Sequence, residues 1–227
     1  MNLLLQSADS LLRGGNQLHY SNAWFTQQPL RLQYIIVVLF GLLYGATMGS
    51  YAGITADRWL HLTYTACKVP LLLGATFVLS WPSFAVANYL LGLGSDLKEA
   101  LKIMLSCQAI VALTLASLAP FTALWYFSIR DYKMALLFNA AVYCIASLAG
   151  QYAIRRSYQV LVVRNKRHRL MLWVWIVVYS FVGIQLAWVL RPFVGSPTEL
   201  VQFIRTEELS NAYVRIAELL WAAVAGD

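Results

Sequence analysis

Residues 170–190 read LMLWVWIVVYSFVGIQLAWVL and directly follow the basic run RNKRHR at 164–169. The apolar stretch contains no Asp, Glu, Lys or Arg, and its 21 residues can cross the hydrocarbon core of a bilayer once as a helix. Basic residues beside such a stretch are typical of the cytoplasmic edge of a membrane span. This segment therefore predicts a membrane-spanning helix that starts inside the cell.

Four other stretches have the same character. Each is free of Asp, Glu, Lys and Arg and has at least 21 residues, but none is long enough to cross a bilayer twice. The chain is therefore predicted to be all-α, a polytopic membrane bundle of about five transmembrane helices. The four stretches are 32–56, 69–95, 103–129 and 134–154.

The composition agrees with a chain that lies mostly in lipid. Of its 227 residues, 60% are hydrophobic and only 12% are charged. A soluble domain of this length needs more charge to cover its surface. We therefore predict an N-terminal cytoplasmic tail over 1–31, a transmembrane domain over 32–190 and a C-terminal tail over 191–227.

The C-terminal tail repeats apolar residues at helical spacing. This spacing predicts one or two amphipathic helices, which lie on the outer membrane surface or hold a partner protein. The residues that form the pattern are Leu200, Phe203, Ile204, Tyr213, Ile216, Ala217 and Leu220.

The distribution of charge predicts the orientation of the chain, whose net charge is +7. With five spans, the N-terminal tail and the second and fourth connections share one side, which holds ten Lys and Arg residues against six on the other. Cytoplasmic connections carry the excess of Lys and Arg. We therefore expect an integral protein of the bacterial inner membrane, with its N-terminus inside and its C-terminus outside.

A basic cluster surrounds the fourth connection. It could bind anionic lipid headgroups or an acidic partner, or it could serve only to set the topology. Binding of nucleic acid is not expected, because the cluster is short and is held at a membrane. Its members are Arg155, Arg156, Arg164, Lys166, Arg167 and Arg169.

The first span contains GLLYGATMGSYAG at 41–53, in which glycines recur at every fourth position. On a helix this spacing places them along one ridge, where another helix can approach to backbone contact. The ridge could pack within the bundle or bind another subunit. The glycines are Gly41, Gly45, Gly49 and Gly53.

Polar and proline residues interrupt the apolar spans. Pro82 and Pro120 lie inside spans and are expected to kink or break their helices. Intramembrane polar side chains could line a solute path, or could bond across helices and fix the packing of the bundle. The candidates for such a site are Lys68, Asn88, Gln108, Asn139 and Gln185.

Lys68 lies at the boundary of the second span, just before Pro70 and seven residues after His61, so that Lys68 and His61 could share a helix face. A lysine inside the membrane would be a functional candidate by default. Because a long uncharged stretch follows it, we favour the interpretation that Lys68 extends its ammonium group to the outer interface.

No sequence motif indicates catalysis. The chain has no HExxH, GxSxG or P-loop motif, and His19, His61 and His168 lack the spacing of metal ligands. We therefore expect no enzyme activity, no catalytic residue, no metal site and no cofactor.

Three stretches carry a resemblance to a known family: YGATMGSYAG at 44–53, KVPLLLGATFVLSWPSFAVANYLLGLG at 68–94 and LASLAPFTALWYFS at 115–128. Over roughly residues 40–155 the chain resembles the Yip-type family of five-span membrane proteins and its bacterial relatives. The resemblance implies five spans with the N-terminus inside. Eukaryotic members of that family bind small GTPases and partner membrane proteins in vesicle traffic.

These observations favour a non-catalytic scaffold or accessory subunit. We expect it to contact membrane lipids and to bind other integral membrane proteins or a second copy of itself. The alternative is a small transporter or channel subunit, with a path lined by kinked helices.

Overall fold

The computed structural model describes residues 29–53, 59–129, 131–195 and 203. The described chain is helical without strands, and five of its helices are long and apolar enough to cross a membrane. The predicted all-α bundle of five spans is thereby confirmed. The helices are α3 (Leu30–Gly49), α4 (Trp59–Leu90), α5 (Leu97–Ser128), α6 (Tyr132–Arg164) and α7 (His168–Val189), with 3-10 turns η1 (Ser50–Ala52) and η2 (Gly94–Asp96).

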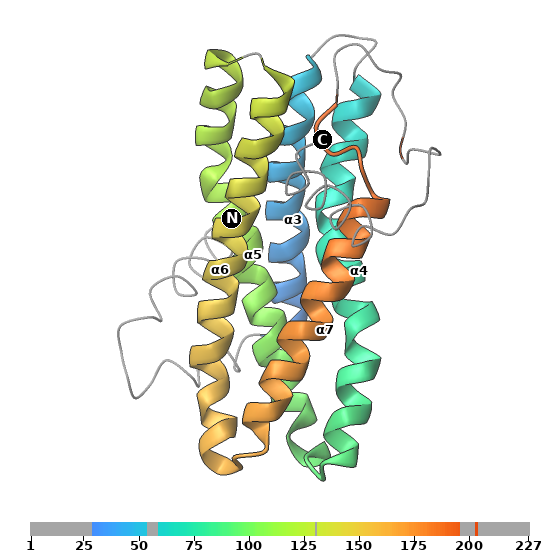
Figure 1. Ribbon diagram of the computed structural model, residues 1–227, viewed down its shortest axis with the longest axis vertical. Helices are drawn as coiled ribbons and strands as arrows, with labels where there is room; N and C mark the ends of the chain where they lie inside the picture. Colours follow the sequence, from blue (N-terminus) through green and yellow to red (C-terminus); the bar gives the residue numbers. More distant parts are fainter. Residues whose placement is uncertain (1–28, 54–58, 130, 196–202, 204–227) are drawn as a thin grey trace, which may run out of the picture.

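The five helices run alternately up and down, so that the bundle has two ends (Figure 1). At the α3–α4 end, uppermost in Figure 1, α3 ends and α4 begins, α5 passes into α6, and α7 ends. At the α6–α7 end, lowermost in Figure 1, α4 passes into α5 and α6 into α7. The chain outside the described residues includes nearly all of both predicted tails.

Helix α5 is the most buried of the five spans. It packs against α3 on one side and α6 on the other, and small side chains recur on its buried face. Because small residues allow helix backbones to approach closely, this face can form close contacts in lipid, where apolar burial alone drives little association. These residues are Ala109, Ala112, Ala116 and Ala119.

Helix α7 packs mainly against α4 and has little contact with α6. The packing uses aromatic rings: the ring of Trp175 lies edge-on to Phe77 and Phe84, with centroids 5.4 and 5.3 Å apart. Such edge-to-face pairs stabilise a contact beyond the area they bury. As a result, α6 and α7 meet at their shared connection and diverge towards the other end (Figure 1).

The glycines of the first span pack against α4. A Cβ atom on Gly41 would lie 3.2 Å from Pro70, and one on Gly49 would lie 2.8 Å from the Cα of Leu62. On Gly45 a Cβ would lie 2.5 Å from the carbonyl oxygen of Thr65. Three glycines at intervals of four therefore form one contact between two helices of the same chain.

Gly53 does not continue this ridge. Helix α3 ends at Gly49, although the charge-free stretch extends to residue 56, and a 3-10 turn follows. Gly53 has a φ of 99°, and a Cβ built on it would meet nothing within 4 Å. Glycine is favoured at position 53 because L side chains rarely adopt a positive φ. The ridge therefore extends only from Gly41 to Gly49, a length of about 12 Å along the helix axis.

The interior prolines do not end their helices. Helix α4 continues through Pro70 and Pro82, and α5 continues through Pro120. Pro70 has no N–H to donate to the carbonyl of Ala66, one turn earlier. That carbonyl oxygen would lie 2.8 Å from a Cβ on Gly45, so the bare glycine leaves room for it.

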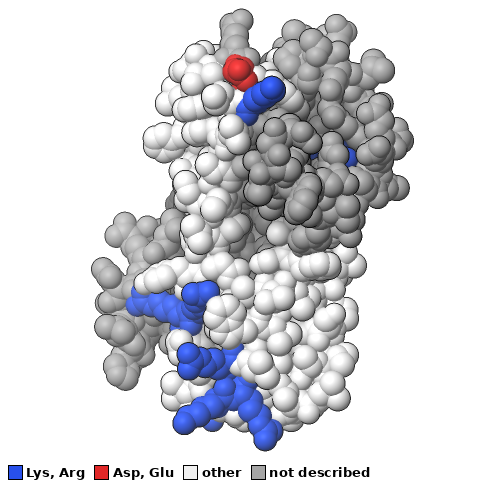
Figure 2. Space-filling view, viewed as in Figure 1, with Lys and Arg blue, Asp and Glu red and all other residues white. Residues whose placement is uncertain are grey.

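The described basic residues divide unequally between the two ends. All of them except Lys68, Lys133 and Arg191 lie towards the α6–α7 end. Figure 2 shows Lys and Arg side chains gathered over the lower part of one face. The described members of the two sides of the ten-to-six count thus lie at opposite ends of the bundle.

Candidate functional site

The polar residues of the spans do not meet in one place. Gln108 on α5 donates a hydrogen bond of 2.8 Å to the carbonyl oxygen of Leu73 on α4. Its own carbonyl accepts a 2.9 Å bond from the hydroxyl of Tyr179 on α7. Both ends of this amide are therefore used to join three helices.

Asn139 joins a different set of helices. Its amide nitrogen donates to the hydroxyl of Tyr126 on α5 at 2.6 Å and to the carbonyl of Ala135 at 2.7 Å. Its oxygen accepts a 3.0 Å bond from the hydroxyl of Tyr44 on α3. The amide thus serves the packing of α3, α5 and α6, and Tyr44 and Tyr126 are partners that the sequence pattern did not indicate.

Asn88 and Gln185 are separate from these two groups. Asn88 is buried on α4, where its amide donates a 2.9 Å bond to Phe84 of the same helix. Gln185 is half-buried on α7. The polar candidates thus occupy separate positions along the bundle, and two of them serve helix packing.

Lys68 contacts the segment that follows α7. We call residues 191–195 the post-α7 segment. The Lys68 ammonium donates a 2.6 Å hydrogen bond to the carbonyl of Pro192, and the side chain is fully buried. The ammonium also lies 5.9 and 5.2 Å from the ring centroids of Phe193 and Phe203, within the range of cation–π attraction.

The Lys68 side chain is thus buried against another part of the chain, and its extension to the outer interface of a membrane stays a prediction. Helix α4 begins at Trp59, well before the charge-free stretch, so that Lys68 lies inside the helix. A buried ammonium group must be compensated by hydrogen-bond acceptors. The post-α7 segment folds back over α4 and supplies a carbonyl oxygen and an aromatic face.

Two further side chains hold the same segment. The hydroxyl of Thr65 on α4 donates to the carbonyl of Phe193 at 3.0 Å, and the hydroxyl of Tyr132 on α6 donates to the carbonyl of Val194 at 3.1 Å. Three consecutive carbonyls, from residues 192 to 194, thus each accept a side-chain hydrogen bond. We call the three donors Lys68, Thr65 and Tyr132 the clamp.

His61 supports the clamp from one helical turn away. Its Nε2 lies 3.3 Å from the hydroxyl oxygen of Thr65. Since Thr65 has one hydroxyl proton and donates it to Phe193, this contact requires a hydrogen on Nε2 of His61. A Cβ on Gly195 would meet the His61 ring, so glycine allows the backbone to pass over it.

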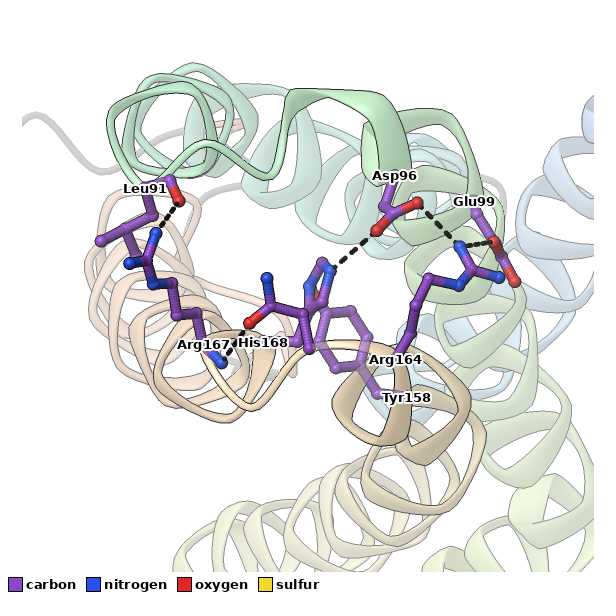
Figure 3. A network of polar contacts seen from close by, with 8 residues as sticks. Leu91, Asp96, Glu99, Tyr158, Arg164, Arg167 and His168 are labelled. Carbon is purple, nitrogen blue, oxygen red and sulfur yellow. Dashed lines mark hydrogen bonds and ion pairs between the residues drawn. The ribbon is translucent and has the colours of Figure 1, made fainter.

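A second network lies at the α6–α7 end (Figure 3). Arg164 donates to Asp96 at 2.7 Å and to Glu99 at 3.0 Å, and Asp96 also lies 3.2 Å from Nε2 of the fully buried His168. The hydroxyl of Tyr158 lies 3.3 Å from Nδ1 of His168. With Nε2 donating to Asp96, a neutral His168 ring accepts from Tyr158 through Nδ1.

Arg167 adds a contact with the turn that follows α4, because its guanidinium donates a 3.1 Å bond to the carbonyl of Leu91 (Figure 3). Two of the six basic candidates, Arg164 and Arg167, therefore donate hydrogen bonds to other parts of the chain. The sequence pattern did not indicate Asp96 and Glu99, although they are the acidic residues of the second connection. Within the described part of the chain, Arg155, Arg156, Lys166 and Arg169 form no ion pair with these two carboxylates.

The polar contacts of the described residues join helices and segments of the same chain. In the described ranges, no group of three or more His, Cys, Asp and Glu side chains could hold a metal ion. The interior polar groups Gln108 and Asn139 fix helix packing, and the clamp and the second network connect segments at opposite ends. No protein-family model, curated protein or solved structure matches the chain.

Proposed function

We propose that the chain is a non-catalytic integral membrane protein, a scaffold or accessory subunit that binds another membrane protein or a second copy of itself. The observation that carries the proposal is the clamp, which holds three consecutive carbonyls of the post-α7 segment. The chain that follows residue 195 therefore leaves the bundle from a fixed position. We propose that this C-terminal region is the part that contacts the partner.

The clamp supports the proposal because it fixes residues 192–194, from which the C-terminal region continues. Ordering a backbone residue costs about 1–2 kcal/mol, so an anchored starting point lowers the entropy that the region would lose when a partner docks. The interior amides give less support to a small transporter, because Gln108 and Asn139 are occupied by bonds between helices. Membership of the Yip-type family stays a prediction beside this proposal.

The proposed orientation places the clamp outside the cell and the α6–α7 end in the cytoplasm of a bacterium. The distribution of Lys and Arg over the two ends supports this orientation.

We predict that alkaline phosphatase joined after Asp227 is active, because that enzyme folds only outside the cytoplasm. The same reporter joined after Asn165, in the α6–α7 connection, should be inactive, and a fluorescent protein should give the opposite pattern at both sites. An inactive phosphatase after Asp227 would contradict the orientation.

The partner proposal predicts a loss of binding when the clamp is weakened. Thr65→Val with Tyr132→Phe removes two donors and keeps the size of each side chain. We expect proteins that co-purify with the full chain in mild detergent to be reduced at least about fivefold in this variant, as detected by quantitative mass spectrometry. That factor corresponds to about 1 kcal/mol, the usual net value of one hydrogen bond.

The matched control is Thr63→Val, since the bonds of the Thr63 hydroxyl to described residues all go to carbonyls of its own helix. Purification through the captured protein should return the unsubstituted chain, and differently tagged copies of the chain would report self-association. Equal recovery of every co-purifying protein from the clamp variant and the control would contradict the proposal. Solute uptake into vesicles by the purified chain alone would favour the transporter instead.

A further inference from the structure

A groove opens between α6 and α7 near their shared connection. It forms because α7 leans towards α4 and leaves α6 as the two helices diverge (Figure 1). The groove has a volume of about 400 Å³. The residues that line it include Arg155, Gln159, Arg169, Leu172, Trp173 and Ile176.

The groove is positively charged and contains no acidic side chain among its described lining residues. Arg155 and Arg169 approach it from opposite helices, whereas Arg164 is already paired with Asp96 and Glu99. The two lining arginines therefore bring positive charge to a site whose walls do not neutralise it. This charge is complementary to an anion, and a planar guanidinium suits phosphate oxygens in particular.

The polarity of the groove changes along α7. Arg169 lies in the first turn of the helix, Trp173 lies one turn further on, and the apolar Ile176 lies about 10 Å from Arg169 along the axis. The guanidinium of Arg155 lies over the Trp173 ring, 5.3 Å from its centroid, which holds both side chains at the rim. Tryptophan and arginine are typical of the level of lipid headgroups.

We propose that this groove binds one anionic phospholipid. The phosphate lies between Arg155 and Arg169, Gln159 supplies a neutral hydrogen-bonding group, and the acyl chains extend along Leu172 and Ile176 towards the middle of the bilayer. The cavity is too small for two whole chains, so most of their length lies on the exposed faces of α6 and α7. A soluble phosphate would use the arginines and leave the apolar wall without a partner.

The proposal is tested on the full chain in a neutral detergent, with dioleoyl phosphatidylglycerol as probe and dioleoyl phosphatidylcholine as comparison. Native mass spectrometry counts the lipids that remain bound. Arg155→Gln with Arg169→Gln should weaken phosphatidylglycerol binding by about tenfold or more, because each basic residue at the headgroup contributes to the attraction. Phosphatidylcholine binding should change less than about twofold.

The matched control is Arg156→Gln with Lys166→Gln, which removes the same charge near the same connection from residues that do not line the groove. Both arginines of the groove are exposed, so their replacement leaves no buried cavity; circular dichroism and a single elution peak check the fold. Retained affinity in the groove variant, or an equal loss in both variants, would overturn the proposal. So would displacement of phosphatidylglycerol by millimolar inorganic phosphate or by an acidic peptide.

Discussion

Replacement of Gly45 by leucine is expected to lower the midpoint of thermal unfolding in detergent by roughly 2–12 °C. The range follows from the usual cost of overpacking, about 1–3 kcal/mol, and from the shift of about 2–4 °C per kcal/mol for chains of this size. The physical reason is that a Cβ at this position would already lie 2.5 Å from the carbonyl oxygen of Thr65 and 2.8 Å from the Cα of Ala66.

Those obstructing atoms belong to the backbone of α4 and cannot rotate aside as a side chain can. Helices α3 and α4 must therefore separate, which also weakens the contacts of Gly41 with Pro70 and of Gly49 with Leu62. In lipid, separation removes close dispersion contacts for which no hydrophobic gain compensates. The effect should appear in the purified protein alone, because the ridge packs within one chain.

Gly74→Leu is the matched control for this prediction. Gly74 also lies in the middle of a spanning helix, but a Cβ built on it meets nothing within 4 Å. Leucine has a higher helix propensity than glycine by about 1 kcal/mol or less, so the control should leave the midpoint unchanged or raise it. If Gly45→Leu and Gly74→Leu melt at the same temperature, α3 and α4 do not meet as described.

The number and type of the helices were predictable because a bilayer imposes one requirement on every span. Each span must satisfy its own backbone hydrogen bonds and needs roughly 20 apolar residues. The ends of the helices were less predictable. Helix α4 begins at Trp59, ten residues before its charge-free stretch, and therefore contains Lys68, whose ammonium donates to the carbonyl of Pro192.

The glycine spacing predicted a close helix contact without predicting which helix makes it. An interval of four places Gly41, Gly45 and Gly49 on one face whether that face meets α4 or another chain. Its position opposite α4 depends on the tertiary arrangement, and in particular on Pro70 and Ala66. Gly53 shared the spacing but not the helix, because spacing alone does not show where a helix ends.

The polar contacts at the two ends were the least predictable part. The post-α7 segment meets α4 across more than 120 positions of sequence, as the bond from Lys68 to Pro192 shows. No local pattern reports such a contact. Likewise, Arg164 and His168 were visible in the basic run at 164–169, but the role of Asp96 between them depends on how η2 packs beside α6 and α7.

Lys68→Met is expected to release the post-α7 segment. Methionine is similar in length to lysine but cannot donate a hydrogen bond, so the carbonyl of Pro192 loses its partner. A buried acceptor left without a donor costs about 1–3 kcal/mol. If this cost falls on the closed segment, its open population should rise roughly 5- to 150-fold. The measurement uses Val194→Cys, because Val194 is 1% exposed, in a chain whose Cys67, Cys107 and Cys144 are replaced by alanine. The rate at which this cysteine reacts with a maleimide should rise by the same factor.

Lys133→Met is the control, because it removes an exposed lysine from the same end of the bundle and should leave the labelling rate unchanged. The rest of the bundle should stay folded in both variants, since the packing of α5 against α3 and α6 does not depend on the post-α7 segment. Equal labelling in the two variants would mean that Lys68 does not hold the segment. If Lys68→Met both labels faster and loses its co-purifying protein, the clamp is connected to partner binding. If Lys68→Met labels faster but keeps that protein, Lys68 holds the segment without contributing to the proposed function.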